Sequence, residues 1–358
     1  MTRRVGSLFS GVGGLDLAVH EVLGGEPAWF VEQNAYCQQV LRKRWPGTPV
    51  YDDVCVVGAH NLSPIDVLCG GFPCQGLSAA GRKRGLIDDD RSVLFFEFAR
   101  IAKELRPKHI VIENVPALLS DWRGLVERTL APEYGLTWVK VAAANVGAPH
   151  LRWRVFILGT LGGKHRGVCH ADKPPAVGAW PTPAAGNFND GQTWEAYEAR
   201  KARLRARGLP ISTPLAMATK PTHRWSTPSA ADNRDRGDIM NTPAVQRRLG
   251  VRQLNLSMQA GGRLSPSFVE VLMGLPLGWT DLSCDDPQSM PWPAPMIRGL
   301  WGDSPQHDWE PPRVVAGKTP HRAARLKALG NAVVPAQAAL ALRMAQDGPK
   351  QLSLLEIA

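Results

Sequence analysis

Short apolar runs alternate with longer amphipathic stretches along the first 160 residues of the chain. Runs with the composition of β-strands cover residues 4–9, 28–32, 65–70, 109–113, 137–143 and 155–158. Between them, apolar residues recur at helical spacing over residues 14–22, 35–44, 92–105 and 117–130. Because strands alternate with helices, the pattern predicts an α/β fold with a doubly wound, Rossmann-like sheet.

The pattern changes after Gly163, where Pro, Thr, Trp and Arg become frequent and strong periodicity disappears. Apolar periodicity returns over residues 264–279, and residues 322–344 have helical spacing with an interruption at 329–335. These changes predict a second, smaller and irregular domain beside the sheet. The expected division is a catalytic domain of residues 1–160 and 321–348, a second domain of residues 161–320 with a Pro- and Trp-rich insertion at 281–320, and a tail of residues 349–358.

Composition excludes several classes of protein. With 44% hydrophobic and 21% charged residues, the 358-residue chain is typical of globular proteins and unlike disordered or fibrous ones. No apolar run approaches the ~20 residues that a membrane helix needs, and the glycine-rich N-terminus lacks the apolar stretch of a signal peptide. We therefore expect a cytoplasmic protein without membrane contact. The six cysteines lack the paired spacing of a zinc site, which predicts reduced thiols and no metal.

The net charge of +10 is concentrated in one segment of the second domain. Residues 198–252 hold twelve Lys or Arg and only four acidic residues, so this segment carries eight of the ten excess positive charges. A basic segment beside a nearly neutral remainder is typical of a module that contacts the phosphates of a nucleic acid.

A glycine-rich motif, Phe9-Ser-Gly-Val-Gly-Gly-Leu-Asp16, lies where the first predicted strand gives way to a helix. Glycines at such a turn let the backbone approach a ligand, and the helix N-terminus offers free N–H groups. Glu32 follows at the end of the next predicted strand, where a carboxylate can accept both hydroxyls of a ribose. Both NAD and S-adenosylmethionine satisfy this pattern.

A cysteine-containing motif, Gly70-Gly-Phe-Pro-Cys-Gln-Gly-Leu-Ser78, directly follows the predicted strand 65–70. Cys74 therefore lies in a loop at the carboxyl end of a strand, where parallel sheets bind ligands, and it is a candidate nucleophile. Glu113 ends the predicted strand 109–113, and we expect it at the same edge. Arg152 and Arg154 enter the predicted strand 155–158 and alternate onto one face, as candidates to hold a planar polar substrate.

Together these ordered motifs resemble those of the DNA cytosine-5 methyltransferases, and the resemblance covers most of the chain. It includes the Phe9–Asp16 loop, Glu32, Asp53, Pro73-Cys74-Gln75, Glu113, Arg152-Trp-Arg154, Arg263–Gly274 and Leu329–Val334. The chain departs from the family pattern at His150, where Gln is usual, and at Gln33, where Trp is frequent. The resemblance implies a Rossmann-like methyltransferase sheet, with the second domain as a target-recognition domain.

The resemblance also implies a role for each matched residue. S-adenosylmethionine, released as S-adenosyl-L-homocysteine, is the implied cofactor, and its implied ligands are Phe9, Ser10, Gly11, Gly13, Gly14, Leu15, Glu32, Asp53, Val54, Pro73, Leu94, Asn331 and Ala332. The implied catalytic residues are Cys74, Glu113, Arg152 and Arg154, and the expected DNA contacts are Ser78, Arg82, Arg84, Arg247, Arg248 and Arg263.

In the implied reaction, Cys74 adds to carbon 6 of a flipped-out cytosine and carbon 5 takes the methyl group. The implied partner is double-stranded DNA, either beside a cognate restriction endonuclease that acts independently or as an orphan or phage enzyme. We expect a monomer associated with the nucleoid of a prokaryote.

Other interpretations stay open at this level. An NAD-dependent oxidoreductase would share the glycine loop and Glu32 but would leave the motif around Cys74 unexplained. A tRNA cytosine-5 methyltransferase would share the catalytic motifs, although the long basic segment favours duplex DNA. A catalytically silent DNA-binding protein would keep the motifs without turnover.

Overall fold

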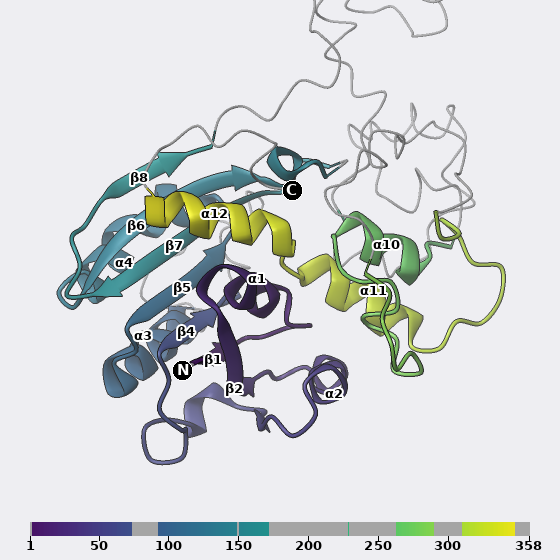
Figure 1. Ribbon diagram of the computed structural model, residues 1–358, viewed down its shortest axis with the longest axis horizontal. Helices are drawn as coiled ribbons and strands as arrows, with labels where there is room; N and C mark the ends of the chain where they lie inside the picture. Colours follow the sequence, from purple (N-terminus) through teal and green to yellow (C-terminus); the bar gives the residue numbers. More distant parts are fainter. Residues whose placement is uncertain are drawn as a thin grey trace, which may run out of the picture.

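The computed structural model describes residues 2–73, 92–148, 150–171, 228, 263–289 and 310–347. Eight strands form one sheet in the order β3-β2-β1-β4-β5-β7-β6-β8 (Figure 1). The strands are β1 (Arg3–Leu8), β2 (Gly25–Val31), β3 (Val50–Tyr51), β4 (Val67–Gly70), β5 (His109–Asn114), β6 (Tyr134–Ala142), β7 (Trp153–Leu161) and β8 (Gly167–His170). The prediction of a doubly wound α/β sheet is confirmed.

One strand runs against the others and thereby shapes the edge of the sheet. The pairs β1–β2, β1–β4, β2–β3 and β4–β5 are parallel, whereas β7 is antiparallel to both β5 and β6. The start of β7 therefore lies at the edge where the parallel strands end. This reversal places the residues around Arg154 beside Glu113, because Glu113 pairs with Phe156 across the two strands.

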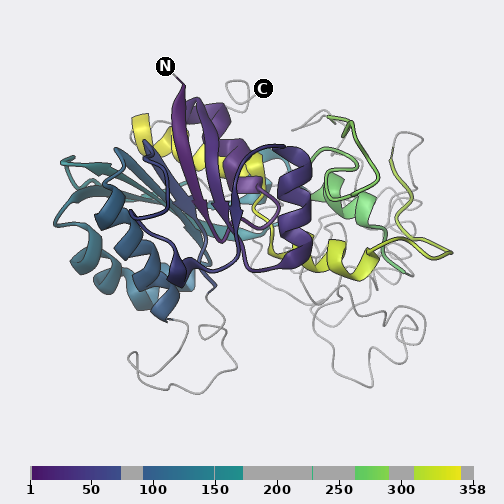
Figure 2. The same ribbon diagram turned by 90° about the horizontal axis from the view of Figure 1, so that it is seen from below.

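Helices cover both faces of the sheet. Helices α1 (Gly14–Leu23) and α12 (Pro335–Asp347) pack on each other and on one face, and α3 (Ser92–Leu105) and α4 (Arg123–Leu130) on the other. Figure 2 shows the blue to teal helices of residues 92–130 and the yellow helix α12 on opposite sides. Strand β5 contributes side chains to the apolar cores on both faces of the sheet, since Ile110 and Ile112 face α3 and Val111 faces α12. Among the described helices, none is long and apolar enough to cross a membrane.

A further apolar core lies beside the sheet. It is built by α2 (Ala35–Arg44), α10 (Pro266–Leu272) and α11 (Arg322–Asn331), together with Trp279. The indole nitrogen of Trp279 donates a hydrogen bond to the carbonyl of Val12, 2.8 Å away, in the glycine-rich loop. Residues that the sequence places in the second domain thus share one core with the predicted catalytic domain.

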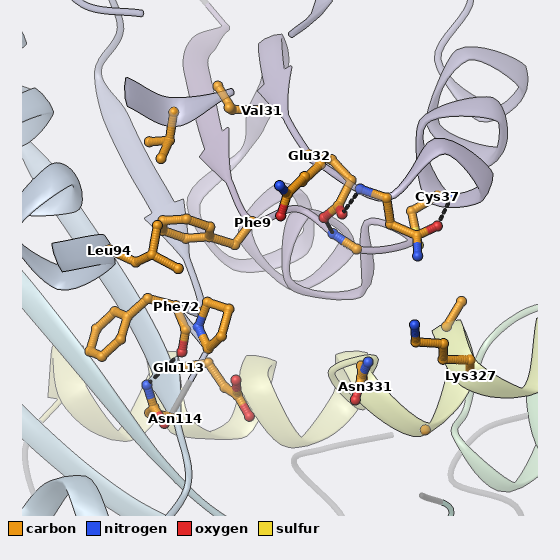
Figure 3. Close-up of a pocket in the computed structure, with 18 of the residues that line it drawn as sticks. Phe9, Val31, Glu32, Cys37, Phe72, Leu94, Glu113, Asn114, Lys327 and Asn331 are labelled. Atoms are coloured by element: carbon orange, nitrogen blue, oxygen red, sulfur yellow. Dashed lines mark hydrogen bonds between the residues drawn. The ribbon is translucent and has the colours of Figure 1, made fainter. Parts of the chain in front are cut away.

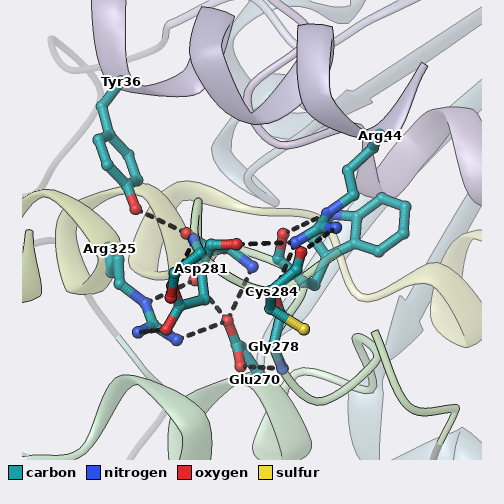
Figure 4. Close-up of polar contacts among 10 residues, drawn as sticks. Tyr36, Arg44, Glu270, Gly278, Asp281, Cys284 and Arg325 are labelled. Atoms are coloured by element: carbon teal, nitrogen blue, oxygen red, sulfur yellow. Dashed lines mark hydrogen bonds and ion pairs between the residues drawn. The ribbon is translucent and has the colours of Figure 1, made fainter. Parts of the chain in front are cut away.

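A buried network of charges holds this core together (Figure 4). The Glu270 carboxylate accepts hydrogen bonds from the backbone nitrogens of Gly278 and Thr280, each at 2.8 Å, and pairs with Arg325 at 3.1 Å. Arg44 donates to four backbone carbonyls of the same loop, at Gly278, Trp279, Asp281 and Cys284. Helix α2 is thereby fixed to the segment that follows α10.

The structure also corrects several expected boundaries. The limit predicted at residue 160 falls inside β7, and β8 continues the sheet to His170 by pairing with β6. Strands β3 and β8 are too short to give a readable alternation, so the pattern did not predict them. The helix expected over residues 117–130 is a π-helical turn, η2 (Leu118–Trp122), followed by α4. The remaining division into domains stays a prediction.

Candidate functional site

A cavity of about 520 Å³ lies at the carboxyl-terminal edge of β1, β2, β4 and β5 (Figure 3). Each of these strands contributes a residue at its end, as the topology of parallel sheets predicts. Figure 3 shows Phe9 and Glu32 on one side of the cavity and Asn331 and Lys327 on the opposite side. The predicted residues in its wall are Phe9, Gly11, Glu32, Asp53, Val54, Pro73, Leu94, Glu113, Arg152, Arg154 and Asn331.

The glycine-rich loop has a backbone that only glycine adopts without strain. Gly11 and Gly13 have φ angles of 56° and 81°, in the left-handed region. A Cβ atom on Gly13 would lie 2.4 Å from the ring of Trp45, and one on Gly14 would lie 2.5 Å from the carbonyl oxygen of Val333. The loop is therefore packed between α2 and the turn that joins α11 to α12.

Glu32 is held by backbone groups on both of its carboxylate oxygens. Its Oε2 accepts a hydrogen bond from the nitrogen of Gly11 and its Oε1 from the nitrogen of Asn34, each at 2.7 Å. The Asn34 side chain caps α2 by accepting from the nitrogens of Tyr36 and Cys37. Since each carboxylate oxygen has two lone pairs, Glu32 keeps acceptor capacity for a ligand in the cavity.

One part of the cavity wall is apolar and suits a planar ring. Phe9, with a φ of 55°, lies beside Leu94 at the start of α3 (Figure 3). Asp53 lines the same cavity and caps the short helix η1 (Val54–Val56) by accepting a hydrogen bond from the nitrogen of Cys55 at 2.8 Å. A carboxylate beside an apolar slot can recognise the amino group of a purine.

A carboxylate and a guanidinium also meet in the wall of the cavity. Arg154 Nε lies 2.9 Å from Glu113 Oε1. A Cβ atom on Gly71 would lie 2.9 Å from Glu113 Oε2, so glycine at this position leaves room for the carboxylate. Asn114 donates a hydrogen bond to the carbonyl of Phe72 at 3.1 Å and fixes the segment that leads to Pro73. Cys74 itself lies outside the described residues.

Arg152 is placed differently from Arg154, although both line the cavity. Strand β7 begins only at Trp153, and Arg152 has a left-handed φ of 34°, so strand alternation does not explain the position of its side chain. Its guanidinium is buried and donates hydrogen bonds to the carbonyls of Gly330 and Ala332. Burial and repulsion by Arg154 lower the pKa of Arg152 to about 9, so it stays charged at neutral pH.

His150 connects the entry of β7 to α10. Its Nε2 lies 2.8 Å from the carbonyl oxygen of Leu272, and the ring is fully buried. Burial lowers the pKa of His150 to about 3, so the ring is neutral and Nε2 donates the hydrogen bond. A neutral histidine thus supplies a hydrogen-bond donor at the position where the family pattern usually has glutamine.

The other predicted residues divide into four groups. Ser10, Gly14, Leu15 and Ala332 line a small cavity of about 40 Å³ that shares Asn331 with the large one, whereas Gly13 lines neither cavity. Arg263 is exposed and donates a hydrogen bond to the carbonyl of Gly317 at 3.5 Å. The expected DNA contacts outside the described residues are Ser78, Arg82, Arg84, Arg247 and Arg248.

The structure adds cavity residues that the motifs did not indicate. Lys327 lines the cavity from α11, four residues before Asn331. This spacing places both side chains on one face of the helix and is the only signal in the sequence that could have indicated it. Cys37 and Asn34 reach the cavity from the start of α2. Within the described ranges, no cluster of His, Cys, Asp or Glu could hold a metal ion.

The fold is similar to solved methyltransferase structures over nearly the full chain. A Spodoptera frugiperda DNMT2 variant has a TM-score of 0.54 at 16% sequence identity and covers 97% of this chain and 100% of its own. The Schizosaccharomyces pombe Dnmt2 methyltransferase has a TM-score of 0.54 at 15% identity, with 97% and 100% covered. At these identities the similarity concerns the fold alone, which is that of a Rossmann-like methyltransferase.

Sequence comparison identifies the family. The Type II methyltransferase M.AquIA of Picosynechococcus is 35% identical over 186 residues, which cover 46% of this chain and 74% of that protein. M.HhaI of Haemophilus parahaemolyticus is 33% identical over 156 residues, 42% of this chain and 47% of that protein. The family model of C-5 cytosine-specific DNA methylases matches residues 3–200. The chain therefore belongs to the C-5 cytosine-specific DNA methylase family, and its enzyme class is DNA cytosine-5 methyltransferase.

Proposed function

We propose that the protein transfers a methyl group from S-adenosylmethionine to carbon 5 of a flipped-out cytosine in a specific sequence of double-stranded DNA. The observation that carries this proposal is the pair of Glu113 and Arg154, 2.9 Å apart, in the same cavity as Phe9 and Glu32. A group that protonates or polarises a base and a site for an adenosine thus share one space. Pro73, directly before Cys74, lines the same cavity.

The chemistry of the cavity fits S-adenosylmethionine. Phe9 and Leu94 would enclose the adenine, Asp53 would accept from its amino group, and Glu32 would accept from the ribose hydroxyls. The small cavity beside the loop would take the amino-acid part, with Asn331 between both spaces. When bound, S-adenosylmethionine supplies an electrophilic methyl group and is released as S-adenosyl-L-homocysteine.

Cytosine needs activation because carbon 5 is a weak nucleophile. In the proposed step the Cys74 thiolate forms a bond to carbon 6, and the electron pair of the ring moves toward nitrogen 3. Glu113 donates a proton or hydrogen bond to nitrogen 3, and Arg154 holds the exocyclic oxygen. Carbon 5 is then enamine-like and takes the methyl group. The carbon-5 proton leaves to water, and the thiolate departs to restore the aromatic ring.

The proposed substrate is duplex DNA, with the basic segment 198–252 as the main contact to phosphates. Flipping the target cytosine out of the helix costs a few kcal/mol, which these contacts offset. In this proposal Arg247 and Arg248 bind phosphates in the recognition segment, and Arg82 and Arg84 bind beside the flipped base. Ser78 and Arg263 would add contacts at the edges of the site.

The test is covalent trapping on DNA that carries 5-fluorocytosine, because fluorine cannot leave as a proton does. We expect a protein–DNA adduct that requires both cofactor and Cys74, and loss of methyl transfer in Cys74→Ser with cofactor affinity retained. Cys284→Ser is the matched control and should form the adduct normally, since Cys284 lies outside the cavity. Retained turnover in Cys74→Ser would refute the covalent step. Transfer to tRNA instead of duplex DNA would refute the proposed substrate.

A further inference from the structure

Arg152 joins three segments that are far apart in the sequence. Its Nη2 donates to the carbonyl of Ala332 at 2.6 Å and to that of Gly330 at 3.3 Å. Its Nη1 donates to Gly330 at 3.3 Å and to the carbonyl of Pro228 at 3.2 Å. The guanidinium therefore holds the turn between α11 and α12 against the start of β7.

The acceptors in this turn need such a donor. Gly330 is in the last turn of α11, whose carbonyls have no partner within the helix, and Ala332 lies in the linker before α12. A positive charge is also favourable at the carboxyl end of a helix. The fork of N–H groups on arginine can satisfy both carbonyls at once, which a lysine ammonium cannot do with the same geometry.

The turn that Arg152 holds is a wall of the proposed cofactor site. Asn331, between the two carbonyls, lines both the large and the small cavity. Val333, two residues after Asn331, lies close to the glycine-rich loop. A Cβ atom on Gly14 would lie 2.5 Å from the carbonyl oxygen of Val333. A shift of this turn would therefore change the width of the cavity at the glycine-rich loop.

We propose that Arg152 is a positioning residue for the cofactor: it fixes the turn at 330–332 and thereby the position of Asn331. In this proposal the flipped cytosine is contacted by Arg154 and not by Arg152. This inference rests on the proposed function, in which the cavity holds S-adenosylmethionine. Arg154 provides the contrast, because it pairs with Glu113 instead of the turn. The two arginines, two residues apart, thus have different partners in the wall of one cavity.

The test measures the dissociation constant of S-adenosyl-L-homocysteine by calorimetry, on the full chain without DNA. Arg152→Gln should raise this constant by about tenfold or more, as expected for the loss of a charge-assisted hydrogen bond. Arg152→Lys should lie between this variant and the wild type. Arg154→Gln is the matched control and should bind S-adenosyl-L-homocysteine within about twofold of wild type, because its partner is Glu113 on β5 and not the turn at 330–332.

Kinetics provide a second readout that a general loss of stability would not reproduce. Arg152→Gln should raise the KM for S-adenosylmethionine more than it lowers kcat, whereas Arg154→Gln should mainly lower kcat. Wild-type affinity and KM in a folded Arg152→Gln would overturn the inference. If that variant does not fold, hydrogen exchange in Arg152→Lys decides: faster exchange at residues 331–338 supports the inference, and unchanged exchange overturns it. Failure of the wild type itself to bind would instead refute the proposed cofactor.

Discussion

Two carboxylate–arginine pairs in this protein differ in their surroundings. Glu113 and Arg154 lie at the cavity, 2.9 Å apart, and their side chains remain 13% and 19% exposed. Glu270 and Arg325 lie between α10 and α11, 3.1 Å apart, and remain 0% and 3% exposed. The two pairs have the same chemistry, so any difference in their roles comes from the structure around them.

The two pairs differ in how many hydrogen bonds each carboxylate already accepts from the protein. Glu270 accepts hydrogen bonds from two backbone nitrogens and from the Thr280 hydroxyl, in addition to Arg325. Its acceptor capacity is taken up by the loop that it holds. Glu113 faces a cavity, and its Oε2 lies over Gly71. A buried pair whose carboxylate already accepts several hydrogen bonds from the protein is therefore expected to be structural. A pair whose carboxylate faces a cavity can instead interact with a substrate.

The largest expected effect concerns activity at the pair of Glu113 and Arg154, which faces the cavity and is called the open pair below. Glu113→Gln keeps the shape of the side chain but removes its proton chemistry, so methyl transfer should fall by about 10²–10⁴-fold. The thermal unfolding midpoint should hardly change, because the pair is partly exposed. Transfer of a labelled methyl group in a single turnover, beside a melting curve, measures both quantities.

A matched control for this variant is Glu127→Gln. Glu127 pairs with Arg123 one turn away on α4, 2.7 Å apart and remote from the cavity. It should keep wild-type activity. Near-normal turnover in Glu113→Gln would show that the open pair is structural too, and the contrast with Glu270 would disappear.

The next effect concerns stability at the buried pair of Glu270 and Arg325. Glu270→Gln leaves Arg325 as a buried cation whose one remaining carboxylate partner among the described residues is Asp281, at 2.8 Å. The free energy of unfolding should fall by about 3 kcal/mol, the lower end of the range for a broken buried pair. Urea unfolding measures this loss, and activity per folded molecule should be largely retained.

The surface pair of half-buried Lys43 and exposed Asp285 provides the control for this variant. Asp285 is almost fully exposed, so Asp285→Asn should leave the unfolding curve unchanged. If Glu270→Gln were as stable as Asp285→Asn, the buried network would not hold the loop after α10. If it instead abolished turnover in a fully stable protein, Glu270 would belong to the site.

These two pairs also show what the sequence could predict. Glu113 was predictable because it ends an apolar strand, and the ends of parallel strands meet at one edge. Glu32 was predictable for the same reason. The pairing of Glu270 with Arg325 was not, because the two residues are 55 positions apart and local periodicity carries no signal for such a contact.

The position of Arg152 was predictable only in part. Its place in a motif near Arg154 indicated a ligand site, and both residues line the cavity in the structure. Its partners were hidden, because a left-handed backbone at Arg152 and the reversal of β7 are set by tertiary packing. Likewise, β8 is a four-residue edge strand whose pairing with β6 depends on neighbours.

A third carboxylate extends the comparison, because it is buried without a cationic partner among the described residues. Asp16 accepts hydrogen bonds from the Ser7 hydroxyl at 3.1 Å and from the Cys69 thiol at 3.6 Å. Burial outweighs these two bonds and raises the pKa of Asp16 from 3.8 to about 6. Glu270 has a buried arginine beside it, whereas the side-chain donors to Asp16 in the described part of the chain are neutral.

The smallest expected effect follows from this raised pKa. Between pH 4 and 6 the folded state binds more protons at Asp16 than the unfolded state, so the contribution of Asp16 to stability decreases as pH rises through this window. Above pH 6 its ionised form destabilises the fold, on the order of 1–3 kcal/mol. Asp16→Asn should therefore be more stable than wild type at pH 7 and equal to it near pH 4. Urea unfolding at a series of pH values measures the difference, and a difference that is constant with pH would show that the pKa of Asp16 is the same in the folded and unfolded states, which would contradict the raised pKa.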